Sequence, residues 1–182
     1  MRKILFRGKR LDNGDWVEGY LYEHEPPLVG IVSEKDEPEA SKWFIARTGF
    51  ADWNLPRPVE LVEVDPSTVG QYTGLKDKNG KRIFEGDLVQ YNTFDDFSCC
   101  SAVKFGEYDQ DGSSGEYTPS VCVGWYVEVC GFTCPDWAED DPIFFKDCQK
   151  QQNLLEVNEM CEVIGNIHDD IDLLGGKFYD NE

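Results

Sequence analysis

Apolar and polar residues alternate with a period of two through much of the first half of the chain. Within residues 16–22, Val17 and Leu21 stand opposite Trp16, Glu18, Tyr20 and Tyr22. Successive side chains of a β-strand point to opposite faces, so this pattern predicts a half-buried strand. Strands are also predicted at residues 3–9, 28–32, 43–47 and 59–64. With no internal repeat and no long amphipathic helix, the chain is predicted to be mainly β.

The most informative local signals lie between residues 68 and 91. Asn79-Gly80 is a pair that tolerates positive φ at both turn positions, and it predicts a tight β-hairpin. After Ile83 and Phe84, the step Glu85-Gly86-Asp87 precedes a further strand. We expect Gly86 to bend the backbone and Asp87 to cap the bend, as at the entrance to the first long strand of a small barrel.

Helix and strand signals are weaker elsewhere. Asp65 followed by Pro66 predicts a short helix, with Asp65 as the N-cap. The second half is predicted to hold a short strand at 103–105, an exposed polar loop at 106–120, a long strand at 121–129 bent at Gly124, closing core segments at 154–155 and 161–167, and a frayed acidic tail from Asp169.

These elements predict a mainly β fold with few short helices. An N-terminal antiparallel sheet over residues 1–64 is expected to pack with a C-terminal SH3-like small barrel over residues 65–182, with an acidic insertion at about 92–160. A chain of 182 residues has enough length for two such regions, or for one compact unit that contains both.

The charge of the chain is unevenly distributed. The net charge is −19, and residues 95–182 hold 4 basic and 20 acidic side chains, a balance of −16. Such a field opposes binding to nucleic-acid phosphates and to anionic membranes. Two interpretations remain: a solvated surface that keeps the protein soluble, or a surface that attracts a basic partner.

The sequence predicts a cytoplasmic protein with reduced thiols. No apolar run approaches the roughly 18 to 20 residues that a membrane-spanning helix needs, and residues 1–7 lack the apolar region of a signal peptide. The seven cysteines are an odd number without a regular framework. A zinc site was considered at Cys122, Cys130, Cys134 and Cys148, but only Cys130 and Cys134 form a close pair, so free thiols and no bound metal are expected.

No motif predicts catalysis or a cofactor. Asp109-Gln110-Asp111-Gly112 begins like a calcium loop, yet the sixth and twelfth positions are Ser114 and Ser120, which lack the required Gly and Glu. A metal could also be chelated at His168, Asp169, Asp170 and Asp172, but the position of these residues near the end of the chain favours a mobile tail. The chain has no phosphate-binding glycine loop, and its two histidines accompany no paired nucleophile. We expect the aromatic residues to serve in the core and in interfaces rather than as a platform for single-stranded nucleic acid; they are Trp16, Tyr20, Tyr22, Trp43, Trp53, Trp125 and Trp137.

Three segments together resemble the YopX family, small proteins encoded by bacteriophages and prophages. They are residues 4–20, the block 64–89 around Asn79-Gly80, and the closing segment 161–168. The resemblance implies a largely β fold and a cytoplasmic setting in an infected or lysogenic bacterium. It brings no catalytic or binding residues with it, and this chain departs from the compact family pattern between residues 92 and 160.

The resulting hypothesis is a non-enzymatic phage accessory protein that binds a host or phage protein, without direct contact to nucleic acid or membrane. In its sharper form, Asp136, Glu139, Asp140 and Asp141 imitate nucleic-acid phosphates and bind a basic groove of the partner. One alternative is a small-molecule binder or enzyme with a cleft between the two halves. Another is a homo-oligomeric structural module assembled through sheet edges.

Overall fold

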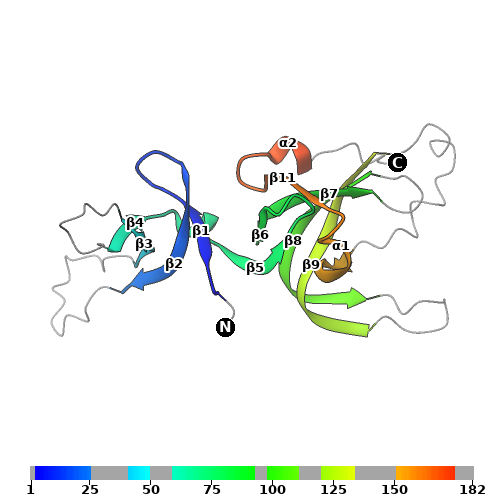
Figure 1. Ribbon diagram of the computed structural model, residues 1–182, viewed down its shortest axis with the longest axis horizontal. Coiled ribbons are helices and arrows are strands. Elements are labelled where there is room, and N and C mark those ends of the chain that lie inside the picture. The colour runs from blue at the N-terminus through cyan, green and yellow to red at the C-terminus, as the bar shows by residue number, and fades with distance from the viewer. Residues whose placement is uncertain are drawn as a thin grey trace, which may run out of the picture. The chain divides into compact units, whose positions relative to one another are not determined.

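The computed structural model describes residues 3–25, 41–49, 59–92, 98–110, 120–133 and 151–174. It divides into two compact units, Met1–Tyr72 and Thr73–Glu182 (Figure 1). Each unit is built from antiparallel strands with few short helices, so the predicted mainly β class is confirmed. The expected boundary between residues 64 and 65 and the SH3-like barrel stay predictions.

The first unit is an antiparallel sheet in the order β4-β3-β2-β1, with the start of β5 beside β1. Its strands are β1 (Phe6–Lys9), β2 (Trp16–His24), β3 (Lys42–Thr48), β4 (Val59–Glu63) and β5 (Gly70–Lys76). These positions confirm the strands predicted at 3–9, 16–22, 43–47 and 59–64. The strand predicted at 28–32 lies outside the described residues.

The alternating pattern places one face of this sheet in a small core. Val17, Ile45, Val62 and Val64 are buried there. At Gly19, a Cβ atom would collide with the carbonyl of Ala46, so β2 and β3 approach each other closely only because this position has no side chain.

A short 3₁₀ helix, η1 (Pro66–Thr68), connects β4 to β5. Asp65 is its N-cap, as predicted, and its side chain accepts the backbone N–H of Ser67 at 2.9 Å. The hydroxyl of Thr68 accepts the N–H of Lys9 at 2.9 Å and donates to the carbonyl of Asp65 at 2.8 Å. These bonds fasten the connection to β1, after which β5 crosses from the first unit into the second.

The second unit contains a five-stranded antiparallel sheet in the order β10-β9-β8-β7-β11. Its strands are β7 (Asp87–Asn92), β8 (Ser98–Gln110), β9 (Ser120–Thr133), β10 (Gln151–Asn153) and β11 (Glu162–Asn166), and β6 (Arg82–Phe84) pairs with β5. The helices α1 (Leu154–Val157) and α2 (Ile171–Leu174) are one turn each. The core joins buried residues of β6, β7, β8, β9, β11 and α1, among them Ile83, Val89, Val103, Val127 and Leu154.

The predicted hairpin at Asn79-Gly80 is confirmed. Its turn is centred one residue earlier than predicted, at Lys78 and Asn79 instead of Asn79 and Gly80. The N–H of Gly80 donates to the carbonyl of Asp77 at 2.9 Å, so Lys78 and Asn79 are the central residues of the turn. Gly80 follows with φ +80°, and Asp77 and Lys81 close the loop through a backbone bond of 2.9 Å. This geometry is that of a three-residue loop ending in a left-handed glycine.

The bend before β7 also matches its prediction. Gly86 has φ +77°, and the buried carboxylate of Asp87 accepts the N–H of Phe84 at 2.7 Å. The side chain of Asp87 therefore caps the bend that Gly86 permits.

The strand predicted at 103–105 is confirmed as part of the longer β8, whereas the loop predicted at 106–120 is wrong for the described residues 106–110 and 120. β8 runs without a break through Gly106 to Gln110, and each of these residues pairs with one in β9. Tyr108 is buried and stacks on Tyr126 with ring centroids 5.2 Å apart. The polar residues of this segment predicted a loop. A solvent-exposed hairpin, however, is held by backbone hydrogen bonds between its strands and needs few apolar side chains.

The described part of the acidic tail that was expected to fray from Asp169 instead forms a turn and the helix α2. The carboxylate of Asp170 accepts the N–H of Asn166 at 2.9 Å, and that of Asp169 accepts the side-chain amide of Asn166 at 3.1 Å. These carboxylates satisfy groups at the end of β11, so they belong to the fold and not to a free tail.

Candidate functional site

The four acidic residues predicted to bind a partner lie outside the described residues. Asp136, Glu139, Asp140 and Asp141 all fall within 134–150, as do Cys134 and Cys148 of the considered zinc set. In sequence this segment is flanked by β9, which ends at Thr133, and by β10, which begins at Gln151.

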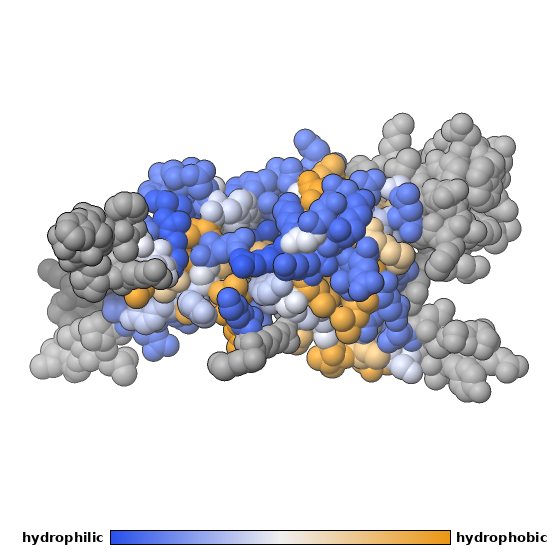
Figure 2. All heavy atoms as spheres, in the orientation of Figure 1, coloured by the Kyte–Doolittle hydropathy of each residue, from blue (hydrophilic) through white to orange (hydrophobic). Residues whose placement is uncertain are grey.

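The outer half of the β8–β9 hairpin exposes large apolar side chains. Phe105 is 56% exposed, Val121 67% and Val123 69%, although hydrophobic residues of a strand ordinarily face a core. The ring of Phe105 meets Trp125 edge-on with centroids 4.9 Å apart, and Trp125 also packs against the core. Figure 2 shows hydrophobic side chains gathered over the lower end of this hairpin.

Acidic residues lie on the same face of the hairpin. Glu107 is the cross-strand partner of Val123, and Asp109 is the partner of Val121. Both acidic residues are exposed. Directly paired residues of antiparallel strands project to the same side of the sheet. Each of these valines of β9 therefore lies next to a carboxylate of β8 on one face of the hairpin. We call this surface the apolar–acidic face; it consists of Phe105, Glu107, Asp109, Val121, Val123 and Trp125.

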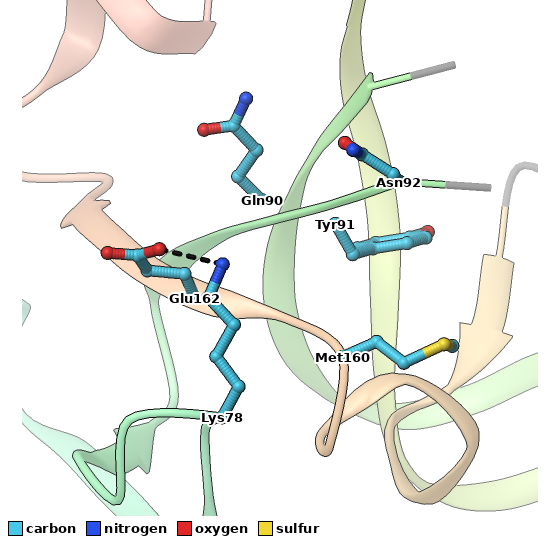
Figure 3. A pocket seen from close by; sticks show the side chains of 6 residues that line it. All are labelled: Lys78, Gln90, Tyr91, Asn92, Met160 and Glu162. Carbon is cyan, nitrogen blue, oxygen red and sulfur yellow. Dashed lines mark ion pairs between the residues drawn. The ribbon is translucent and has the colours of Figure 1, made fainter. Parts of the chain in front are cut away.

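A shallow pocket of about 330 Å³ lies elsewhere in the second unit (Figure 3). Lys78 and Glu162 form an ion pair at 2.8 Å across it, and this hydrogen bond raises the pKa of Lys78. Gln90 donates to the hydroxyl of Ser98 at 2.7 Å. The remaining lining residues are Tyr91, Asn92 and Met160.

The lining of this pocket is polar, and its two charged groups neutralise each other. Ligand sites are usually lined mainly by apolar groups and have volumes of roughly 300 to 1,000 Å³. The pocket lies at the lower end of that range and offers no unbalanced charge to select a ligand. The geometry therefore favours the apolar–acidic face over the pocket as the candidate functional site.

The cysteines considered for zinc are not brought together where they are described. Cys122 contacts the side-chain carbonyl of Gln110 at 3.5 Å, whereas Cys130 lies against Cys100, with the two Sγ atoms 3.8 Å apart. No group of three or more potential metal ligands occurs among the residues that the structure describes. The approach of Cys100 to Cys130 was not predicted, because it depends on the register of two strands.

The structure also bears on the two other cation sites, the calcium loop that would begin at Asp109 and the metal site around His168. Asp109 belongs to β8, so it does not begin a calcium loop, and Asp111 lies outside the described residues. The carboxylates of Asp169 and Asp170, the two residues after His168, accept hydrogen bonds from Asn166. These bonds have a structural role at the end of β11.

Comparison with known proteins agrees with the resemblance seen in the sequence. The family model described as YopX protein matches residues 6–175, nearly the whole chain. The chain belongs to the YopX family. No curated protein matches it. For this YopX family member, the match extends across residues 92–160, which include the apolar–acidic face.

Within the described residues, no helix is long and apolar enough to span a membrane.

Proposed function

We propose that this YopX family member is a non-enzymatic accessory protein of phage or prophage origin that binds a host or phage protein in the bacterial cytoplasm. The observation that carries the proposal is the apolar–acidic face of the β8–β9 hairpin. Exposed apolar groups that gather on one surface and are bordered by charged residues are typical of protein-binding sites.

The apolar part of this face supplies the energy of binding. Fully burying a valine side chain contributes about 1.5 kcal/mol or more, so Val121 and Val123 together supply about 3 kcal/mol. Phe105 and Trp125 are already held against each other. Aromatic residues fixed in this way lose little conformational freedom on binding and commonly act as the anchors of an interface.

The charges on the face determine what kind of partner fits. Glu107 and Asp109 lie directly beside the two valines, and residues 95–182 carry a balance of −16. A partner must therefore combine an apolar depression with lysine or arginine side chains around it. Such charge complementarity accelerates association and excludes acidic competitors.

The sharper form of the proposal extends this acidic surface to Asp136, Glu139, Asp140 and Asp141. These residues follow β9 directly in sequence, and their carboxylates would imitate the phosphates of a nucleic acid in a basic groove. The charge count of the segment supports this extension.

The experiment uses two charge-inserting variants and a matched control. Host proteins are first captured by cross-linking to the full-length chain and then identified and purified. Calorimetry next measures how tightly each one binds wild type, Val123→Lys and Val59→Lys. Val123 and Val59 are both strongly exposed strand residues, at 69% and 71%, but Val59 lies in β4 of the other unit. We expect Val123→Lys to weaken binding at least tenfold and Val59→Lys to leave it unchanged.

A second variant separates the charge contribution from the apolar one. Glu107→Lys is expected to weaken binding most at low salt, because exposed charges are screened beyond about 8 Å at physiological ionic strength. A partner that binds Val123→Lys and Glu107→Lys as tightly as wild type contradicts the proposal. The oligomeric alternative predicts self-association of the pure protein that Val59→Lys at edge strand β4 abolishes, which sedimentation measures.

A further inference from the structure

We propose that Cys100 and Cys130 form a dithiol site that a peroxide oxidises to an intramolecular disulfide. The site lies on adjacent strands of the second unit, independently of the apolar–acidic face. Its function is that of a peroxide-responsive clamp between β8 and β9.

The first support is the distance between the two sulfurs. The Sγ atoms are 3.8 Å apart, and the thiol of Cys130 also donates to the backbone carbonyl of Cys100 at 3.2 Å. A disulfide forms when this separation closes to about 2.05 Å. Both side chains are half-buried, so they combine access for a small oxidant with a restricted set of orientations.

The second support is the strand register. Cys100 pairs with Gly131 and Ser101 with Val129, so Cys130 is the extra residue of a β-bulge opposite Cys100. Because a β-bulge sets two residues of one strand against one of the other, Cys130 and Gly131 both lie opposite Cys100, and the contact between the two sulfurs shows that the cysteine side chains reach each other. The bulge brings Cys130 to the same side of the sheet as Cys100.

The third support is the difference between this pair and two other described thiols, Cys99 and Cys161. The hydrogen bond from Cys130 lowers the pKa of Cys100, and the same bond, together with burial, raises the pKa of Cys130. Burial raises the pKa of Cys161 to about 11, and Cys99 is buried with 2% of its surface exposed. Because the thiolate is the reactive form, Cys100 is the preferred nucleophile among these cysteines.

The chemistry balances with hydrogen peroxide as the named oxidant. The Cys100 thiolate attacks one peroxide oxygen, the O–O bond breaks, and Cys100 becomes a sulfenic acid while the other oxygen leaves as water after protonation. The sulfur of Cys130 then attacks the sulfenic sulfur, and the S–O bond breaks with release of a second water. Each sulfur loses one electron and the peroxide gains two.

The test exposes the reduced full-length protein to hydrogen peroxide and counts thiols after denaturation. The chain has seven cysteines, and we expect five free thiols at the end point together with an intact mass lower by two hydrogens. Peptide mapping is expected to find Cys100 linked to Cys130. The crosslink closes a loop of about 30 residues, so the melting temperature is expected to rise by several degrees and to return when dithiothreitol is added.

Matched variants make the assignment specific. Cys100→Ser and Cys130→Ser are expected to form no disulfide, whereas Cys122→Ser, which removes another half-buried thiol of β9, is expected to oxidise like wild type. Wild-type protein that keeps seven thiols, or whose map shows a link between any other cysteines, overturns the proposal. The peptide map of wild type gives this result even where a variant does not fold.

Discussion

The carboxylate of Asp77 accepts the backbone N–H of Val163 at 3.0 Å, joining the β5–β6 turn to β11, 86 residues later in the chain. Its other oxygen accepts the N–H groups of Asn79 and Lys81 at 2.9 and 2.8 Å. One buried side chain thus shapes the turn and holds the closing strand beside it.

Replacing Asp77 by alanine is expected to lower the free energy of unfolding by about 3 kcal/mol, because three backbone N–H groups lose a charged acceptor. Chemical denaturation of the full-length protein measures the change. Asp12→Ala serves as the control, since this exposed carboxylate bonds the neighbouring side chain of Arg10 on the surface, and no measurable change is expected there. Equal stabilities of Asp77→Ala and Asp12→Ala would contradict this assignment.

Two glycine replacements test the conformation of the hairpin turn. Gly80 has φ +80° and Gly124 does not have a positive φ, although a Cβ at either position meets nothing within 4 Å. Gly80→Val is expected to destabilise the protein by about 1 kcal/mol or more, because a β-branched residue resists positive φ. Gly124→Val is expected to be neutral or stabilising, because valine favours extended strands. Thermal unfolding distinguishes the two, and an unchanged melting temperature for Gly80→Val would remove the turn assignment.

The pair formed by Lys104 and Glu128 predicts a small acid-dependent contribution to stability. The hydrogen bond from Lys104 lowers the pKa of Glu128 in the folded state. A carboxylate with a lowered folded pKa stabilises the protein above its unfolded pKa, which is about 4.3, and loses that contribution as the pH falls through the folded value. Glu128→Gln is therefore expected to reduce stability slightly at pH 7 and to match wild type near pH 2. Denaturation curves across this range test the direction, and the effect is small because the pair is partly exposed to solvent, which screens it.

Neutralising the acidic residues that follow β9 tests the nucleic-acid mimic. Replacing Asp136, Glu139, Asp140 and Asp141 by Asn or Gln is expected to weaken binding of the partner while leaving the melting temperature unchanged. The wild-type complex is expected to weaken steeply as salt is added. If a partner binds with an affinity that ignores both salt and these changes, the acidity serves solubility alone.

The local elements of this protein follow from short stretches of its sequence. The alternation in residues 16–22, the cap at Asp65, the left-handed Gly80 and the bend at Gly86 were all predicted, because a few neighbouring residues determine φ and the nearest hydrogen bonds. The family resemblance likewise rests on such local motifs.

The candidate site could not be found in this way. Whether Val121 and Val123 face a core or solvent depends on where the ladder between β8 and β9 ends relative to the packed core of the second unit. The polar residues at 106–110 gave no sign that this segment pairs with β9. Backbone N–H and C=O groups form these hydrogen bonds whatever the side chains are.

The sequence by itself determined the β class, the strands near 3–9, 16–22, 43–47 and 59–64, the turns at Gly80 and Gly86, the strong acidity and the family. Only the tertiary structure decided that Asp77 meets Val163, that Cys100 meets Cys130, and that Glu107 lies beside Val123. Each of these relationships joins residues far apart in the chain. For the last two pairs the spacing is set by the register of β8 against β9, with a β-bulge at Cys130, and a shift of one residue in this register would turn the side chains to opposite faces of the sheet.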